Sequence, residues 1–450
     1  MSTAEPTTKK WYQRLGPGLI TACVVIGPGS ILTSSKVGST EGYGMSWVVV
    51  TAVCFMLIYM GLGAKLGVVS NDTPCNLIAN RAGRWLAVII GIAVFFISAS
   101  FQFGNNLGVA SAFQLYLPKD GVKLGETVVS AKWAVMGLVV AFNTLSISFL
   151  FLFKNLYKAI ERLMMMFVAV MLVAFAANLI FAKPDLGGLA LGFLPGTRGE
   201  ADLSVLGLVG TTFVITAGFF QAYLVQEKGW KKSELRDGQV DACVGSTIMA
   251  LITLMLMTTA AAVLRGQDLG DVKDVAKGLE PLFGQKGQLL FCLGLFSAAY
   301  SSFLVNSMIG GFILSDGLGL GGKPTDFWPR VMTTIVLLTG MGVALFVVST
   351  GIKPVPAIVA AQAVTVLAAP LIAGALLWLT NRKDIMGEDR TEPVINVFAG
   401  LGFVILVAMS WYTASEKVWP KIEEWRNPPA VTQSDNSPGQ FERPEFTAFK

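Results

Sequence analysis

The sequence predicts an all-α integral membrane protein with eleven transmembrane helices. The 450-residue chain has a mean hydropathy of +0.62, and only 14% of its residues are charged, against about a quarter in soluble proteins. Its apolar residues fall in long blocks such as residues 164–182. About 20 consecutive apolar residues are enough for a helix to cross the hydrocarbon core of a bilayer, so these blocks predict membrane spans.

The predicted spans follow one another with short loops. They cover residues 15–39, 46–69, 84–117, 131–152, 157–182, 203–226, 240–265, 285–313, 330–350, 355–380 and 393–414. The mixed-charge stretch 265–286 between two of them is predicted to form a short separate helix outside the membrane. The Pro-rich polar tail has little to bury and is predicted to be disordered.

Composition excludes several classes of function. The net charge is +5 with no basic patch interleaved with aromatics, so nucleic acid is not an expected partner. The five cysteines show no paired spacing, and there is no histidine, which removes the commonest nitrogen ligand and the side chain that titrates near neutral pH. No nucleophile with a base and no phosphate loop is present. We therefore expect no enzyme activity and no cofactor.

Lysine and arginine predict the orientation. With the N-terminus in the cytoplasm, the loops on that side hold more of these residues than the external loops do, as the positive-inside rule requires. The sequence therefore predicts a multi-pass protein of the cell membrane, with the bilayer and a transported solute or ion as its partners.

The first span contains the sequence Ile26-Gly27-Pro28-Gly29-Ser30 near its centre. Pro28 has no N–H to bond the carbonyl four residues earlier, and the two glycines leave helical geometry at little cost. Irregular backbone survives at membrane depth only where it is buried in protein or lines a cavity. One interpretation is that the helix is discontinuous here and forms part of a substrate site. The alternative is a simple proline kink without a functional role.

The sixth span carries a second interruption at the matching place. Thr and Gly occur several times within residues 210–221, which lie five spans after the first break. Two such helices predict an inverted five-plus-five repeat with one extra helix. The predicted division is a cytoplasmic segment 1–14, a transporter domain 15–414 and a disordered tail 415–450. Within the domain, repeat one is 15–182, repeat two is 203–380 and the extra helix is 393–414.

Several stretches resemble the Nramp (natural resistance-associated macrophage protein) family. They are GPGLITACVVIGPGS in the first span, AKLGVVS at 64–70, YKAIERL and FAKPDLGGLALGFLPG at 157–163 and 181–196, FSAAYSSFLVNSMIGGFILSDG in the eighth span and NRKDIMGE at 381–388. The resemblance covers Gly16 to about Tyr412. It implies a LeuT-type fold with discontinuous helices 1 and 6, and proton-coupled symport of divalent metal cations.

The chain departs from this family at the metal site. Gly27 and Ser30 stand where the family has the Asp and Asn of Asp-Pro-Gly-Asn. Residues 214–216 align with its Met-Pro-His, and Gln221 with a later His. Gln102 and Asn105 align with acidic residues near the family's proton path. Each ionisable or soft ligand is thus replaced by a small or neutral group, and burying a doubly charged ion among such groups is costly.

The predicted substrate site lies between the first and sixth helices. Its residues are Gly27, Gly29, Ser30, Thr33, Thr212, Thr216, Gly218 and Gln221, with Gln362 nearby. The alternative is that these polar side chains only bond between helices, as Ser and Thr commonly do. Which metal, if any, this site would hold is not determined by these residues.

A second group of polar residues is predicted to line the pathway or to serve coupling. Gln102, Asn105 and Asn106 lie in the third span, and Ser301 and Ser302 in the eighth. Ser301 and Ser302 could complete a sodium site with carbonyl groups near residues 25–26. Packing between helices is the alternative role for all five.

Three functions remain open. The family resemblance favours a metal cation transporter working by alternating access. A neutral break with exposed helix N-terminal N–H groups favours instead a small polar or carboxylate-bearing organic solute. The third possibility is a membrane sensor or assembly partner that keeps the fold without transport.

Overall fold

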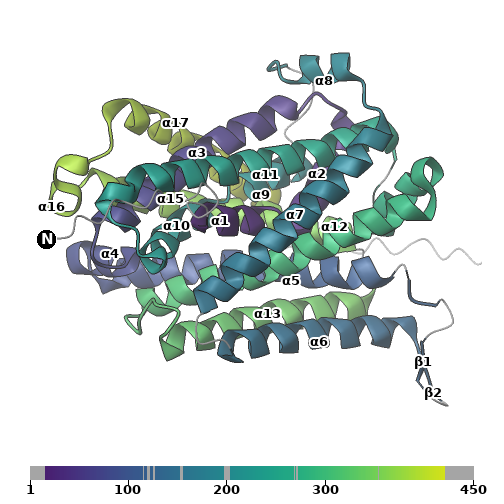
Figure 1. Cartoon of the computed structure of the whole chain (residues 1–450), viewed down its shortest axis with the longest axis horizontal. Helices are drawn as coiled ribbons and strands as arrows, with labels where there is room; N and C mark the ends of the chain where they lie inside the picture. The colour runs from purple at the N-terminus through teal and green to yellow at the C-terminus, as the bar shows by residue number, and fades with distance from the viewer. Residues whose placement is uncertain are drawn as a thin grey trace, which may run out of the picture.

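The computed structural model describes residues 16–420 apart from 115, 119–121, 125–126, 153–155, 197–202, 268, 270–271 and 353. The predicted cytoplasmic segment 1–14 and residues 421–450 of the predicted tail lie outside the described residues. The described chain is a bundle of long helices with one short antiparallel hairpin of β1 (Val122–Leu124) and β2 (Thr127–Val129) (Figure 1).

The prediction of eleven membrane crossings is confirmed. Over the described residues, 10 helical spans are long and apolar enough to cross a membrane, and one bent pair supplies a further crossing. The continuous ones are α3 (Ser46–Val69), α5 (Arg84–Gln114), α6 (Ala131–Leu152), α7 (Leu156–Ala182), α11 (Leu235–Val263), α12 (Val272–Gly317), α13 (Phe327–Thr350) and α17 (Pro393–Tyr412). Short helices α4 (Pro74–Ala82), α8 (Leu186–Gly192) and α16 (Lys383–Met386) lie at the ends of the bundle (Figure 1).

Three spans are interrupted. The first consists of α1 (Pro17–Val25) and α2 (Pro28–Glu41), which are bent by 55°. The sixth consists of α9 (Leu203–Thr212) and α10 (Ile215–Lys228), and the tenth of α14 (Pro354–Val364) and α15 (Ala369–Asn381) joined by a 3-10 turn. The first two breaks were predicted from Gly, Pro and Thr. The third was not predicted, although Pro370 cannot donate to the carbonyl of Val366 inside the turn.

Two boundary predictions are wrong. The tail predicted as disordered from residue 415 is helical over residues 415–420, where a π-helix at Thr413–Val418 continues the last span. Residues 272–286 do not form a separate helix, because α12 runs continuously for 46 residues. Its apolar part begins at about Lys286. The charged part continues the same helix, although it contains Gly278, Pro281 and Gly284.

The interrupted helices occupy the centre of the bundle. Every residue of α1 is buried. In the most apolar window of the sixth span 83% of residues are buried, against 17% in the last span. α1 packs on α10 and α2 packs on α9, and α11 covers both halves of the first span. The two predicted breaks are therefore neighbours inside the protein, and neither faces lipid.

Glycine allows these central helices to approach closely. A Cβ on Gly63 of α3 would collide with the carbonyl of Gly218 on α10, and one on Gly67 would collide with Ala222. Small residues at such crossings let backbones meet directly, which is how helices associate without a hydrophobic driving force in lipid. The contact of α3 with α10 fixes the second half of the sixth span.

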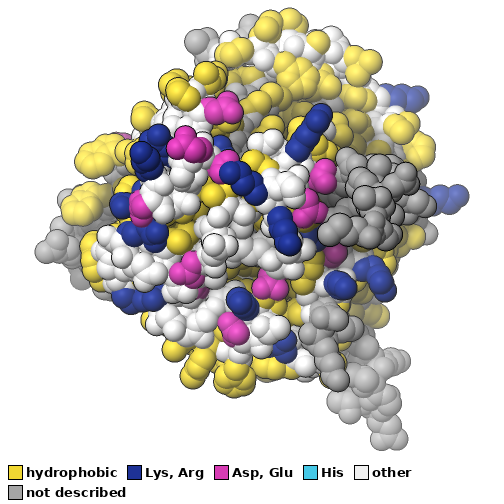
Figure 2. All heavy atoms as spheres, turned by 60° about the vertical axis from the view of Figure 1, so that its left-hand side comes forward, with side chains coloured by type: hydrophobic (Ala, Val, Ile, Leu, Met, Phe, Trp, Pro, Cys, Tyr) yellow, Lys and Arg dark blue, Asp and Glu magenta, His cyan; other side chains and the backbone are white. Residues whose placement is uncertain are grey.

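Charged groups cluster at the end of the bundle where the described chain begins, which we call the N-side end (Figure 2). There Arg81 and Arg382 contact Asp384 at 2.6 and 2.7 Å, and Lys232 contacts Asp389 at 2.5 Å. Hydrogen bonds from Arg382 and then Arg81 lower the pKa of the Asp384 carboxyl to about 2. These exposed pairs connect the loop after α15 to α4 and α11.

The crossing of α3 and α10 makes a prediction. Gly63→Ala should lower the melting temperature, because its Cβ must displace the α10 backbone at a cost of roughly 1–3 kcal/mol. Gly61→Ala, on the same helix with no atom within 4 Å of the added Cβ, is the matched control and should gain helix propensity without a clash. Equal melting temperatures in a stability assay in detergent would show that the crossing is not tight.

Candidate functional site

The first break frees the carbonyl groups at the end of α1. Ile26 has φ −86° and ψ 73°, and Gly27 is extended with φ −109° and ψ 177°. The Ser30 hydroxyl turns back and donates to the carbonyl of Val25. It also lies 3.4 Å from the carbonyl of Thr211 on α9. Ser30 therefore connects both ends of its own break to the helix that carries the second break.

The second break lies at Phe213 and Val214, where Val214 has φ −80° and ψ 84°. Just before it, the Thr211 hydroxyl is 3.3 Å from the hydroxyl of Thr33 on α2. Thr33 itself lies 2.7 Å from the carbonyl of Gly29, to which it donates. The first turn of α2 and the last turn of α9 thus share a polar contact at the level of both breaks.

Gln221 joins the two other half-helices. Its side-chain oxygen accepts a hydrogen bond of 2.6 Å from the Thr21 hydroxyl on α1. Its Nε2 is buried and has no hydrogen-bond partner among the described residues. Gln221 therefore offers a spare donor beside the middle of α1, five residues before the break at Ile26.

Gln362 on α14 approaches the break from the opposite side. A Cβ on Gly29 would lie 2.6 Å from the Gln362 Nε2, and one on Gly104 of α5 would lie 3.3 Å from it. Gln362 is fully buried, and neither its amide nitrogen nor its oxygen has a partner in the described part of the chain. A buried amide without partners costs roughly 1–3 kcal/mol, so Gln362 is suited to accept a ligand.

A seam of amides runs from the first break into the bundle. The Asn105 amide donates to Gln102 Oε1 at 2.7 Å and to Ser302 Oγ at 3.2 Å, and Ser302 donates to the carbonyl of Val24 at 3.1 Å. Gln102 in turn donates to the carbonyl of Phe303 at 2.9 Å. Three helices, α1, α5 and α12, are joined by this seam.

The seam extends to α6 through Asn106. Asn106 donates to the Gln102 carbonyl at 2.8 Å and accepts from Asn143 at 2.6 Å. Every side chain in the seam is neutral. Ser301 is not part of it: its hydroxyl donates to the carbonyl of Ala298 on its own helix at 3.1 Å.

The other predicted residues are placed as follows. The hydroxyls of Thr212 and Thr216 are buried beside the second break without partners among the described residues. Thr216 lines a cavity with Phe213 and Thr365. Gly218 lies on the far side of α10, where its own Cβ would meet Tyr59 of α3, so it serves the helix crossing described above.

Sequence reasoning missed Thr21, Thr211 and Asn143. Each has its partner on another helix: Thr21 bonds 200 positions away, Thr211 178 positions and Asn143 37 positions. Thr211 was the one with a local signal, since it directly precedes the predicted Thr212. Nothing in the local sequence around Thr21 or Asn143 indicates a partner.

The site carries no formal charge. Within the described residues no group of three or more His, Cys, Asp or Glu side chains converges. The polar groups near the breaks are backbone carbonyls, hydroxyls and amides. Two fully buried carboxylates, Asp241 and Asp316, lie elsewhere: Asp241 contacts the start of α1, and Asp316 contacts Thr73 and Tyr223.

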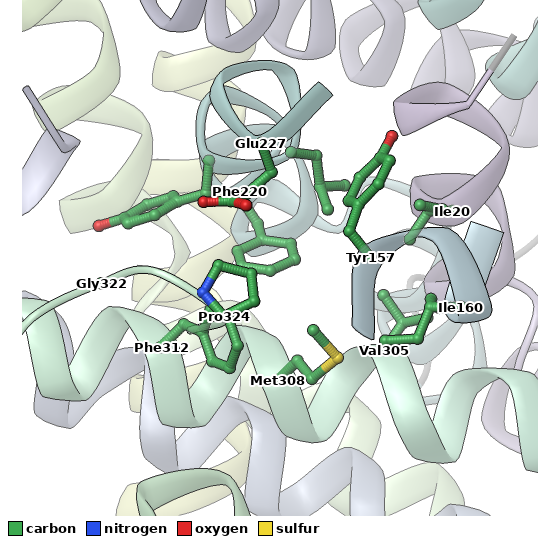
Figure 3. A pocket seen from close by; sticks show the side chains of 12 residues that line it. Ile20, Tyr157, Ile160, Phe220, Glu227, Val305, Met308, Phe312, Gly322 and Pro324 are labelled. Carbon is green, nitrogen blue, oxygen red and sulfur yellow. The ribbon is translucent and has the colours of Figure 1, made fainter. Parts of the chain in front are cut away.

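An apolar chamber lies between the breaks and the N-side end (Figure 3). It is narrow in this conformation: the accessible volume between α1, α7, α10 and α12 is about 10 Å³, which is room for about one water molecule. Its lining residues are Ile20, Tyr157, Ile160, Phe220, Tyr223, Leu224, Glu227, Val305, Met308, Phe312, Gly322 and Pro324. Tyr223, Glu227 and Gly322 also line a polar hollow that continues to the surface.

We call this space the inner chamber. Its apolar walls separate the neutral donors at the breaks from the charged N-side surface. Ser30, Thr33, Gln221 and Gln362 are all at most 2% exposed. The site is therefore closed on this side in the described conformation.

The model of the family described as natural resistance-associated macrophage protein-like matches residues 18–416. The chain is 26% identical to the divalent metal cation transporter MntH of Deinococcus radiodurans over 412 residues, 88% of each chain. It is 27% identical to MntH of Aeromonas hydrophila over 423 residues, 92% of this chain and 98% of the relative.

A solved structure shares the fold. The Eremococcus coleocola manganese transporter superimposes with a TM-score of 0.75 at 18% sequence identity, covering 96% of this chain and 92% of that one. At this identity the likeness concerns the fold and not the cargo. It confirms the predicted fold class, a LeuT-type arrangement of helices with discontinuous helices 1 and 6.

The seam makes a prediction that a double-mutant cycle tests. Asn105→Ala and Ser302→Ala should be non-additive, with an interaction energy of roughly 0.5–3 kcal/mol, because they share one hydrogen bond. Asn105→Ala combined with Ser307→Ala is the control, since Ser307 bonds only the carbonyl of Leu304 among its described contacts. Additive losses of unfolding free energy in both cycles would contradict a connected seam.

Proposed function

This chain belongs to the natural resistance-associated macrophage protein-like (Nramp) family, and from that premise we propose that it is a secondary-active transporter of a divalent metal cation. Two named relatives are divalent metal cation transporters. The family model covers nearly all of the described residues. We propose a transport role, without catalysis, for the whole membrane domain.

The observation that carries the proposal is the meeting of two helix breaks in the centre of the bundle. Ser30 contacts Val25 and Thr211, and Thr33 contacts Thr211. Half-helices that end at such a junction can tilt separately, since no continuous ladder of hydrogen bonds joins them. A buried junction between two broken helices suits alternating access around one central site.

The ligand atoms at the site restrict the kinds of cargo that it can bind. Carbonyls of Val25 and Thr211, the Ser30 hydroxyl and the unpartnered amide oxygen of Gln362 are neutral oxygen ligands. Hard cations accept such ligands, whereas softer transition metals prefer imidazole or sulfur. We propose that the cation keeps part of its hydration shell at this site, because no carboxylate compensates its charge.

A small polar or carboxylate-bearing solute is the second candidate. The hydroxyls of Thr212 and Thr216 and the Nε2 atoms of Gln221 and Gln362 lack partners among the described residues. These are hydrogen-bond donors, and a neutral or anionic solute would satisfy them where a cation would not. This candidate therefore rests on the spare donors, and the metal candidate on the family.

We propose that the amide seam couples transport of the cargo to the movement of a second ion down its gradient. Family resemblance implies protons, but Gln102, Asn105 and Asn106 do not titrate. Ser302 and the carbonyl of Val24, 3.1 Å apart, face one another beside Asn105 and are proposed to bind a small monovalent cation such as sodium. A pH gradient and a sodium gradient therefore have to be compared directly.

We propose that the protein lies in the cell membrane with its N-terminus in the cytoplasm. Lysine and arginine gather with acidic residues on the N-side end (Figure 2), and cytoplasmic loops carry such an excess. In this orientation the inner chamber lies on the cytoplasmic side of the two breaks.

Uptake into reconstituted vesicles tests the function. Manganese, magnesium and a panel of amino and organic acids should be compared with and without pH and sodium gradients; we expect a divalent cation to accumulate. Ser30→Ala should lower the uptake about tenfold or more, because a bond to both breaks is lost, whereas Ser307→Ala should not. Uptake of an organic acid alone would establish the second candidate, and no uptake by folded protein would favour a sensor or assembly role.

Restoring the family's carboxylate makes a separate prediction. Gly27→Asp should lower the KM for manganese, because it adds a carboxylate at the first break; its Cβ would come within 2.8 Å of Ser302 Oγ, so the Ser302 side chain must shift to admit it. Gly27→Asn has the same shape without the charge and is the matched control. Equal KM values for both variants would show that position 27 does not face the cargo.

A further inference from the structure

The start of α1 is held by a buried carboxylate. Asp241 on α11 is fully buried and accepts hydrogen bonds from the backbone N–H of Gly16 at 2.8 Å and of Gly18 at 2.5 Å. These are N–H groups that a helix start leaves without internal partners. A carboxylate in this place also matches the positive end of the helix dipole.

Side chains of two other helices also surround the start of α1. Gly16 lies where a Cβ would meet Lys228 Nζ at 2.8 Å and the Tyr157 hydroxyl at 3.2 Å, and Lys228 forms an ion pair with Glu161. The N-side start of α1 is thus enclosed by charged and polar groups of α7 and α10 as well as by α11.

Backbone contact closes the arrangement. A Cβ on Gly18 would collide with the carbonyl of Asp241, and one on Gly245 would collide with the carbonyl of Gly18. Gly18 and Gly245 therefore let α1 and α11 touch directly. We call Asp241, its two hydrogen bonds and this glycine crossing the α1 clasp.

The clasp sets one wall of the inner chamber. Ile20 of α1 lines the chamber opposite Val305 and Met308 of α12, and Tyr157 lies next to the clasp and in the same wall (Figure 3). α1 has only 9 residues and is separated from α2 by the break. A helix this short has little stability of its own, so its position depends on its contacts.

We propose that Asp241 is a positioning residue that holds α1 in the closed position and so keeps the inner chamber shut. This inference rests on the proposed transport function, in which α1 moves to release the cargo. The ionised carboxylate accepts both N–H groups; a neutral group in its place accepts fewer bonds and no longer complements the helix dipole. Loss of the charge therefore releases α1.

Asp316 offers a comparison within the same protein. It is also a fully buried carboxylate, but it accepts from Thr73 at 2.7 Å, Cys75 N–H at 3.1 Å and Tyr223 at 2.6 Å. These partners lie in α4 and its N-terminal turn and in α10, not in α1. Neutralising Asp316 removes a charge of the same kind without touching the clasp.

The charge of Asp241 also makes the clasp sensitive to pH. The groups that face it are Lys228 from α10 and Glu161 and Tyr157 from α7. The first turn of α1 brings no ionisable side chain, and α3 brings Lys65, whose ammonium donates to the carbonyl of Arg390. A proton on Asp241 would act as the amide substitution does, because both remove the charge.

A native cysteine reports the position of α1. Cys23 is fully buried in α1, and its Sγ lies 3.7 Å from the carbonyl of Met164. In a background with the other four cysteines replaced by alanine, a membrane-permeant maleimide should modify Cys23 slowly. Asp241→Asn should raise this rate about tenfold or more, since charge-assisted bonds are lost, while Asp316→Asn should leave it unchanged.

The pH dependence of Cys23 modification distinguishes a specific role of the Asp241 charge in positioning α1 from a general loosening of the protein. The ratio of the Asp241→Asn rate to the unsubstituted rate cancels the chemistry of the thiol, and it should fall toward one as the pH is lowered and the carboxylate takes up a proton. A ratio that stays constant with pH would overturn the role of the charge.

A second variant keeps the proposal testable if Asp241→Asn does not fold. Gly245→Ala leaves the carboxylate in place but pushes on the backbone of Gly18, and it should also raise Cys23 modification. Cysteine labelling does not depend on the cargo. If the protein shows no uptake but the labelling rates change as expected, the transport proposal is refuted and the proposed role of Asp241 stands. Normal uptake with unchanged labelling in both variants would refute the clasp and keep the function.

Discussion

Backbone polar groups set free inside an apolar bundle must find partners, and this constraint shapes the centre of the molecule. The breaks at Gly27 and at Val214 expose carbonyls and N–H groups where no water or lipid headgroup is at hand. The Ser30 hydroxyl donates to the carbonyl of Val25 and lies 3.4 Å from the carbonyl of Thr211 on α9, and Ser302 of α12 donates to the carbonyl of Val24. The broken first helix is thereby held to α9 and α12, and the two breaks stay together.

The same constraint explains why the centre can be polar without being charged. Hydroxyls and amides satisfy freed backbone groups at short range, and their burial costs far less than that of an isolated charge. Relatives at 25–27% identity share the family, and a solved relative shares the fold. Fold and cargo are separable properties, since the fold is maintained by helix packing and the cargo is selected by a few side chains.

Charge is instead concentrated toward the N-side end. Asp241, Glu161 and Lys228 surround the start of α1, and exposed ion pairs connect the neighbouring loops. The neutral centre and this charged end are separated by the apolar inner chamber. A helix half that is attached at one end by a carboxylate and interrupted at the other has two places at which its position can be altered.

Local chemistry explains which features could be predicted. Apolar blocks determine membrane spans, and Pro28 between two glycines determines a helix break, because both effects act within a few residues of the chain. The interruption of the sixth span was also predicted from its Thr and Gly residues. The 3-10 turn at Thr365–Leu367 was missed, although Pro370 just after it removes the N–H that would bond the carbonyl of Val366.

The sequence by itself determined the number of crossings, the place of the first break and the neutrality of the residues around it. Only the tertiary structure decided which polar groups meet: Thr21 with Gln221, Asn106 with Asn143, and Asp241 with the N–H groups of Gly16 and Gly18. The last two partners are 225 and 223 positions from Asp241. Propensity and hydropathy act along the chain, whereas these bonds depend on how separate helices pack, and no local pattern encodes that packing.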